Sequence, residues 1–125
     1  MKPNNVDSVK PDEGSSSFEH LMKDKDDRKV RDSYILVGDE TTDSGRLKAG
    51  YTVIFPECRT NGHAHDEFEE IYFIARGKGK MIIGEEEFEV SSGDSFYVPF
   101  GKWHATINES RGPLEYFWVL SRKED

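Results

Sequence analysis

The sequence predicts an all-β protein of the double-sheet jelly-roll type, and two observations support this fold class. Eight short runs rich in Val, Ile, Tyr, Phe and Trp follow one another between residues 33 and 120, punctuated by Gly, Pro, Asn and Asp. No helical apolar pattern interrupts this series, and eight strands suit a double-sheet jelly roll. The length of 125 residues leaves room for one such domain.

The expected strands are 33–37, 51–55, 71–75, 80–83, 87–90, 95–98, 103–107 and 115–120. Between the fourth and fifth runs, Gly84-Glu85 suits a two-residue hairpin turn that begins with glycine. Further turns are expected at residues 77–79 and 92–94, where glycines cluster.

The chain divides near residue 29 into an N-terminal arm, residues 1–29, and a barrel domain, residues 30–125. The first 14 residues carry too few apolar groups to offset the entropy of ordering them. Residues 17–24 are predicted either to form a short helix or to be disordered, and the two readings weigh equally. The helical reading rests on a capping-box sequence and an i, i+3, i+4 apolar face, made by Ser16, Glu19, Phe18, Leu21 and Met22.

Composition restricts the partners and the compartment. The net charge of −8 argues against nonspecific nucleic-acid binding. No apolar run is long enough to span a membrane, and the first residues lack the apolar region of a secretory signal. The single cysteine, Cys58, excludes an internal disulfide and fits a reducing, cytoplasmic location. We expect Cys58 to be a small buried residue of the core rather than a reactive group.

Two segments bring together four candidate metal ligands. His63 and His65 are two residues apart, so on an extended strand they face the same side. Glu70 opens a strongly apolar run, and His104 follows a Pro-x-Gly turn much later in the chain. Three imidazoles and one carboxylate suit a divalent first-row transition metal, not calcium or a structural thiolate zinc site.

These segments resemble the two motifs of the cupin family, G-x5-H-x-H-x3,4-E-x6-G and G-x5-P-x-G-x2-H-x3-N. The second motif matches at every fixed position: Gly93, Pro99, Gly101, His104 and Asn108. The first motif matches at His63, His65, Glu70 and Gly77, and departs only at its leading glycine, where this chain has Glu57. Together with the strand pattern, the resemblance extends over about residues 30–121.

The resemblance implies a double-stranded β-helix, the cupin barrel, with one metal ion per chain. Four protein ligands on an octahedral ion leave two open positions, where a water or a chelating substrate can bind. The anionic ligand Glu70 favours Mn²⁺ or Fe²⁺, with Ni²⁺ and Zn²⁺ as competitors. Within the family this carboxylate can also leave the metal and act as a base, so Glu70 is the candidate catalytic residue.

Strand alternation predicts the side chains that line the pocket. If Glu70 points inward, Tyr72 and Ile74 do so too, and Tyr72 becomes a candidate substrate contact. Arg59 is the second candidate, because it would face inward with His63 if the strand were unbroken. Gly62 makes that continuity uncertain, and an exposed loop arginine is the alternative reading of Arg59.

The resulting hypothesis is a metal-dependent enzyme that acts on a small polar metabolite, such as an oxo-acid, an enediol or a sugar derivative. Oxygenase chemistry is slightly favoured over isomerase or epimerase chemistry and over decarboxylase or lyase chemistry. The alternative is a non-catalytic module that binds a metal or a small molecule, although an intact ligand set favours an enzyme. A homodimer is expected, because a small jelly roll leaves sheet edges and an apolar outer face uncovered.

Overall fold

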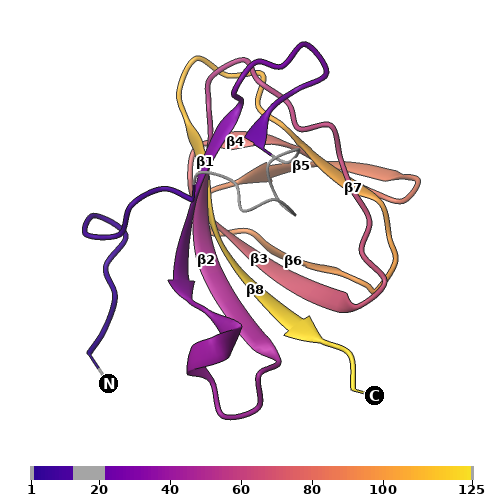
Figure 1. The fold of residues 1–125 in the computed structure, drawn as a ribbon. Helices are drawn as coiled ribbons and strands as arrows, with labels where there is room; N and C mark the ends of the chain where they lie inside the picture. The colour runs from indigo at the N-terminus through magenta and orange to yellow at the C-terminus, as the bar shows by residue number, and fades with distance from the viewer. Residues whose placement is uncertain (1, 13–21, 125) are drawn as a thin grey trace.

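The structure, a computed structural model, describes residues 2–12 and 22–124, and it confirms the all-β jelly roll (Figure 1). Every expected strand is present. The strands are β1 (Arg31–Val37), β2 (Leu47–Ile54), β3 (Phe68–Arg76), β4 (Lys78–Ile83), β5 (Glu86–Ser91), β6 (Ser95–Val98), β7 (His104–Ile107) and β8 (Leu114–Arg122). One turn of 3-10 helix, η1 (Asp39–Thr41), connects β1 to β2.

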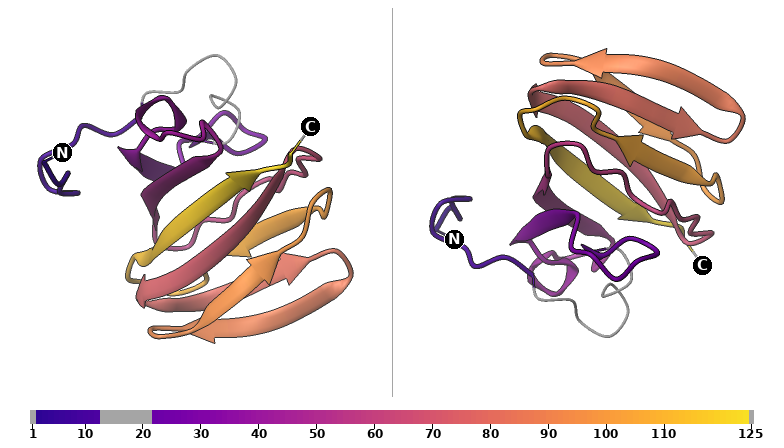
Figure 2. Two further views of the ribbon diagram at one scale, coloured as in Figure 1. Left: turned by 90° about the horizontal axis from the view of Figure 1, so that it is seen from below. Right: turned by 90° about the horizontal axis from the view of Figure 1, so that it is seen from above.

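The strands form two antiparallel sheets that face each other. One sheet has five strands in the order β1-β2-β8-β3-β6, and the other has three in the order β5-β4-β7. The two views of Figure 2 show these sheets as separate layers. Residues 58–63 run beside β7 through the isolated bridges Arg59↔Ile107 and His63↔His104, and so extend the smaller sheet. The bridge at His63 brings one motif against the other.

Alternating burial along β3 separates its two faces. Glu70, Tyr72 and Ile74 are buried, whereas Ile71 and Phe73 are exposed on the outer face. Successive side chains of a strand point to opposite faces, so one period-2 pattern supplies both the barrel interior and the outer surface. The predicted inward orientation of Tyr72 is therefore confirmed.

The core lies between the two sheets. Its largest fully buried side chains include Tyr116, Ile54, Ile74, Met81 and Leu114, drawn from both sheets. Cys58 belongs to this core as a free, buried cysteine, as the sequence predicted. The β4–β5 hairpin closes through Gly84-Glu85, and Gly84 has a φ of +61°, which explains the glycine at the start of this turn.

The N-terminal arm contacts the free edge of β1. The backbone N–H of Asp12 donates to the carbonyl of Ser33 (2.7 Å), and Asn4 Nδ2 donates to the carbonyl of Leu36 (2.7 Å). Most of the predicted helix, residues 17–24, lies outside the described residues. At its end, Lys23 forms an isolated β-bridge with Lys29.

The predicted domain division near residue 29 stays a prediction. Among the helices that the structure describes, none is long and apolar enough to cross a membrane.

Candidate metal centre

Backbone hydrogen bonds place two of the predicted ligands side by side. The N–H of His63 donates to the carbonyl of His104 (3.0 Å), and the N–H of His104 donates to the carbonyl of His63 (2.9 Å). The two imidazole rings lie with their centroids 4.3 Å apart. The centroid of His65 lies 5.2 Å from that of His63 and 5.4 Å from that of His104. The two motifs thus meet through main-chain pairing, independently of any bound ion.

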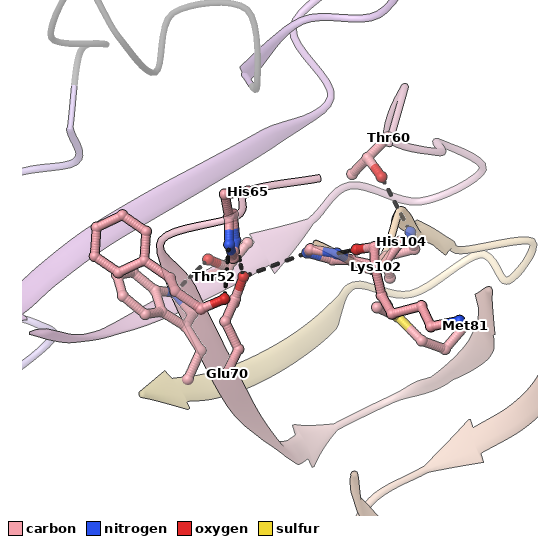
Figure 3. A network of polar contacts seen from close by, with 10 residues as sticks. Thr52, Thr60, His65, Glu70, Met81, Lys102 and His104 are labelled. Carbon is pink, nitrogen blue, oxygen red and sulfur yellow. Dashed lines mark hydrogen bonds and ion pairs between the residues drawn. The ribbon is translucent and has the colours of Figure 1, made fainter. Parts of the chain in front are cut away.

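Glu70 completes the cluster from β3. Its carboxylate contacts His65 Nε2 and lies 3.3 Å from His104 Nε2, and Figure 3 shows it between these two rings. One ligand atom from each of His63, His65, Glu70 and His104 lies within 4.8 Å of the others. The structure therefore brings together all four residues that the sequence predicted as metal ligands.

Backbone carbonyls orient two of the imidazoles. His104 Nδ1 lies 3.0 Å from the carbonyl of Lys102, and His65 Nδ1 lies 3.2 Å from the carbonyl of Phe68. A carbonyl only accepts, so each Nδ1 carries a hydrogen, and in the neutral ring each Nε2 then has its lone pair available for a metal ion. This arrangement, with the second ring nitrogen held by the backbone, is the usual one for metal-bound histidines.

The electrostatics of the cluster favour a cation. Burial raises the pKa of Glu70, but contacts with the His104 and His65 rings outweigh it and lower the pKa to about 2. Burial and the neighbouring His104 charge lower the pKa of His63 to about 3. Burial opposes charge on His65 as well, yet its hydrogen bond and charge interaction with Glu70 prevail and raise its pKa. A neutral His63 and an ionised Glu70 are the protonation states that metal ligation requires.

The donor set fits a metal ion. His104 is 2% exposed, and its Nε2 has no hydrogen-bond partner within the described chain, although it lies 3.3 Å from Glu70 Oε1. The two atoms are close enough for an ion pair, but their angles do not meet the geometry of a hydrogen bond. A nitrogen lone pair and a carboxylate oxygen repel each other unless a positive charge lies between them. A divalent cation bound by three imidazoles and one carboxylate supplies that charge.

The Pro-x-Gly turn supports the His65 side of the cluster. The N–H of Gly101 donates to the carbonyl of His65 (3.0 Å), and Gly101 has a φ of +71°. A Cβ at this position would lie 2.9 Å from Asp66 Oδ1, so both the conformation and the space favour glycine. The second motif therefore supplies the ligand His104 and also fixes the backbone beside His65.

The asparagine of the second motif has a structural role. Asn108 Nδ2 donates to the carbonyls of Ile54, Phe55 and Gly112 at 2.9–3.1 Å. Its Oδ1 accepts from the N–H (3.0 Å) and hydroxyl (2.7 Å) of Ser110. This buried amide joins the end of β2 to the loop before β8, and it does not line the cavity.

Glu57, at the leading-glycine position of the first motif, retains a glycine-like backbone. Its φ is +59°, in the left-handed region that favours glycine. The turn is thus kept although the glycine is absent. The N–H of Glu57 donates to the carbonyl of Ser110 (3.1 Å), so the same hydrogen-bonded loop holds this turn in place.

The cluster opens onto a cavity of about 240 Å³ on the inner face of the larger sheet, lined by residues of β1, β2, β3 and β8 and by residues 63–65. Its described lining includes His63, His65, Glu70 and Tyr72 together with the apolar residues Met22, Ile35, Ala64, Phe68 and Leu120. Burial and the charge of Glu70 raise the pKa of Tyr72 well above its ordinary value, so its hydroxyl keeps its proton. Tyr72 stacks on Tyr116 with ring centroids 4.8 Å apart.

The expectation that Arg59 contacts the substrate is not supported by its position. Arg59 is exposed and is absent from the cavity lining, while its neighbour Thr60 is buried and pairs with Thr106. The strict alternation fails at Gly62, whose φ of +81° interrupts the extended run between Arg59 and His63. Arg31, which the sequence analysis did not single out, lines the cavity instead.

The chain belongs to the cupin family, because the profile of the cupin domain matches residues 50–120. Among curated proteins it is similar to a glucose-6-phosphate isomerase of Thermococcus litoralis, with 32% identity over 106 residues that cover 74% of this chain and 55% of that protein. It is also 42% identical over 53 residues, 42% of either chain, to an uncharacterized protein of Methanocaldococcus jannaschii. The chain thus spans about half the length of the curated relatives it matches.

Solved structures share the fold at low sequence identity. A predicted oxalate decarboxylase of Thermotoga maritima superposes with a TM-score of 0.80 at 18% identity and covers 98% of this chain and 100% of its own. The polyketide cyclase RemF of Streptomyces resistomycificus gives 0.76 at 17% identity, covering 99% and 82%. At these identities the likeness concerns the barrel and not the reaction.

Proposed function

We propose that this chain is a metal-dependent cupin enzyme that acts on a small polar metabolite bearing a carbonyl or carboxylate group. The observation that carries the proposal is the His63–His65–Glu70–His104 cluster, in which Glu70 and His104 are buried, at the wall of a cavity that can admit a small molecule. The four residues would hold one divalent ion, with Mn²⁺ or Fe²⁺ preferred and Ni²⁺ or Zn²⁺ as competitors. When bound, such an ion polarises a substrate oxygen and stabilises developing negative charge.

The surrounding side chains support chemistry rather than storage of the ion. Glu70 is ionised and faces the cavity, so it is the candidate base once it is displaced from the cation. The protonated Tyr72 hydroxyl on the same strand face is a candidate proton donor. Apolar side chains such as Phe68 and Leu120 line the remaining wall, where they limit water and strengthen the electrostatic interactions of the site.

Isomerase chemistry is the reaction class that we rank first. The relative from Thermococcus litoralis is named for an isomerisation, and a carboxylate base beside a proton-donating tyrosine suits proton transfer next to a carbonyl. Oxygenase chemistry, which the sequence analysis slightly favoured, and decarboxylation are the next classes to test. The non-catalytic alternative is a binding module that uses the same cluster and cavity.

Deuterium incorporation separates these possibilities. Protein loaded with Mn²⁺ or Fe²⁺ is incubated in D₂O with a panel of 2-oxo acids, aldoses and ketoses, and the products are analysed by mass spectrometry. An isomerase places deuterium at the carbon next to the carbonyl, an oxygenase consumes O₂, and a decarboxylase releases CO₂. Metal-free protein and a Glu70→Gln variant are the controls. The incubations are repeated with Ni²⁺ and Zn²⁺, and if no compound turns over with any of the four metals, the binding-module reading replaces the enzymatic one.

A further inference from the structure

Strand β1 brings a buried arginine to the cavity. Arg31 is 6% exposed and shares the inward face of β1 with Ser33 and Ile35, which also line the cavity. Arginine is rarely buried to this degree unless its charge is compensated. The buried guanidinium of Arg31 is therefore expected to have a partner that compensates its charge.

The protein offers hydrogen-bond partners to only some of the N–H groups of this guanidinium. The Tyr116 hydroxyl makes a hydrogen-bonding contact with Arg31, but Arg31 Nε has no hydrogen-bond partner among the residues that the structure describes. A buried N–H without an acceptor is destabilising, and more so on a charged group. An orphaned donor of this kind at a cavity wall is expected where a ligand supplies the missing acceptor.

Neighbouring side chains fix the surroundings of Arg31. Ser33 Oγ lies 2.9 Å from Thr52 Oγ1, and Trp118 Nε1 donates to the same Thr52 oxygen (2.9 Å). Because these three residues line the cavity beside Arg31, the polar groups of this wall are already paired with one another. Arg31 Nε takes no part in this network.

The charge of the cavity favours an anion. The charged lining residues within the described chain are two cations, Arg31 and Lys48, and two anions, Asp12 and Glu70, which cancel formally. A divalent ion at the four-ligand cluster would then leave the cavity with an excess of roughly two positive charges. Its volume of about 240 Å³ corresponds to roughly eight water molecules, which suits a small metabolite.

We propose that Arg31 is the carboxylate-binding residue of this cavity, so that the substrate is a small oxo-acid or dicarboxylate whose opposite end faces the metal centre. This inference rests on the proposed function, because it assigns that function's substrate class. A guanidinium can bind a carboxylate through Nε and one Nη in two parallel hydrogen bonds, and Nε is the atom left without a partner. Arg31 acts by positioning the anionic end of the substrate.

Phosphate is the competing anion, and the observations favour carboxylate. Phosphate sites usually combine several donors, such as backbone N–H groups at a helix N-terminus or a glycine-rich loop. Here one guanidinium edge is offered within a regular strand, next to hydroxyls that already bond each other. A planar two-oxygen group matches this single edge better than a tetrahedral group.

Calorimetric titration with defined anions tests the inference. Oxalate, malonate, succinate and inorganic phosphate are titrated into wild type, Arg31→Gln, Arg31→Lys and Arg59→Gln, each with Mn²⁺ and without metal. Arg59→Gln is the matched control, because Arg59 is exposed and outside the cavity lining. Circular dichroism and metal analysis accompany every variant.

At least one dicarboxylate should bind wild type, and its affinity should fall tenfold or more in Arg31→Gln. The affinity should change less than twofold in Arg59→Gln. The metal content of both variants should equal that of wild type. Arg31→Lys should fall between, since lysine offers a point charge without the paired geometry. If Arg31→Gln does not fold, Arg31→Lys is the deciding variant. An unchanged dicarboxylate affinity in Arg31→Lys then overturns the inference.

Four further outcomes have defined meanings. The inference fails if no dicarboxylate binds wild type, or if Arg31→Gln binds as wild type does. It also fails, as to substrate class, if phosphate binds more tightly than every dicarboxylate and depends on Arg31. If the protein binds no metal, the proposed function fails separately. Arg31-dependent dicarboxylate binding to the metal-free protein would then still support the anion site, and its absence would overturn both.

Discussion

The two ends of the cavity differ in origin. All four candidate metal ligands lie within residues 50–120, the segment that the cupin domain matches. Arg31, Ser33 and Asp12, which also line the cavity, precede that segment. The segment matched by the family model thus supplies the metal centre. Residues outside that segment, on β1 and the N-terminal arm, supply the part of the cavity to which we assign substrate specificity.

The two ends also differ in how the fold holds them. The metal end is built where residues 58–63, β3 and β7 converge, with reciprocal backbone hydrogen bonds between His63 and His104. The Arg31 end lies on β1, an edge strand that pairs with β2 alone within its sheet. Edge elements with fewer partners open more readily than central ones. We therefore expect mutations at the Arg31 end to alter ligand binding before they alter the barrel.

The largest expected effect is loss of metal from the centre. His63→Ala combined with His104→Ala removes two of the four ligands, so metal content should fall from near one ion per chain to near zero. The barrel should persist in circular dichroism, because its strands are held by sheet hydrogen bonds rather than by the ion. Glu67→Gln, an exposed acid between two ligands and outside the cluster, should keep its metal. Retention of metal by the double variant would disprove the ligand assignment.

Asn108 should be the most sensitive structural residue near the metal end. Asn108→Ala leaves the three carbonyls that its amide contacts without that donor, and the free energy of unfolding should fall by about 2–4 kcal/mol. Folded Asn108→Ala protein should still bind one metal ion, because Asn108 touches no ligand side chain in these hydrogen bonds. Urea unfolding with metal analysis of the folded fraction measures both effects. A stable variant that has lost its metal would mean that Asn108 belongs to the site.

The metal end was predictable from the sequence, because its ligands sit at fixed spacings on strongly patterned strands. Alternation along Glu70, Tyr72 and Ile74 gave the inward face of β3 correctly. Arg31 was missed because its role depends on the long-range register of β1 against β2, in which Arg31 pairs with Ile54 and Ser33 with Thr52. Polarity along β1 does not distinguish its two faces, since Ile35 shares a face with Arg31 and Ser33 while Tyr34 shares one with Asp32.

The failure at Arg59 has a local cause. The prediction extended the alternation of side chains backward from His63 through residues that do not form a regular strand. The left-handed backbone of Gly62 breaks this alternation, so Arg59 does not face the same side as His63. The glycine was visible in the sequence, but its φ was not. Arg31 lies two residues before the predicted strand 33–37, so the sequence analysis assigned it to no face, whereas β1 begins at Arg31 itself.

The outer face of the larger sheet should mediate pairing of two chains, as the sequence predicted. We propose that its exposed apolar residues form the dimer interface, since Ile71 (54% exposed) and Phe73 (47%) lie beside Tyr97, Phe117 and Val119 on neighbouring strands. Light scattering should give about twice the 14.3 kDa chain mass for wild type. Phe73→Glu should shift it toward one chain without loss of metal. A wild-type protein of single-chain mass at micromolar concentration would refute the proposal.

Metal-free and metal-loaded protein should respond to pH in opposite directions. The pKa of His65 is raised above 6.5, so its protonation stabilises the metal-free fold below that pH and this contribution disappears as pH rises through the folded pKa. Metal binding needs His65 deprotonated, so metal-loaded stability should grow over the same range. Below pH 6.5 the lowered pKa of His63 acts in the opposite sense, because that buried imidazole stays neutral in the fold while it protonates in the unfolded chain. Melting temperatures between pH 7 and 9 therefore measure both slopes. Glu70→Gln should flatten the metal-free slope, and an unchanged slope would contradict the His65–Glu70 coupling.

The smallest effect should come from Glu57. Replacing a left-handed glutamate by glycine relieves backbone strain, so Glu57→Gly should stabilise the protein by about 0.5–1 kcal/mol. Glu67→Gly is the matched control at an exposed position without positive φ, and it should destabilise the fold slightly. Chemical denaturation resolves the difference. A destabilising Glu57→Gly would mean that the Glu57 side chain makes a contact that matters.

The most direct test of the two-ended cavity is an anomalous-scattering map of crystals grown with Mn²⁺ and the dicarboxylate that binds most tightly. The account predicts one strong anomalous peak within bonding distance of His63, His65, Glu70 and His104, and carboxylate density against Arg31 Nε. A peak elsewhere, or none at full Mn²⁺ occupancy in solution, would contradict the metal centre. A dicarboxylate bound away from Arg31 would contradict the second end of the cavity.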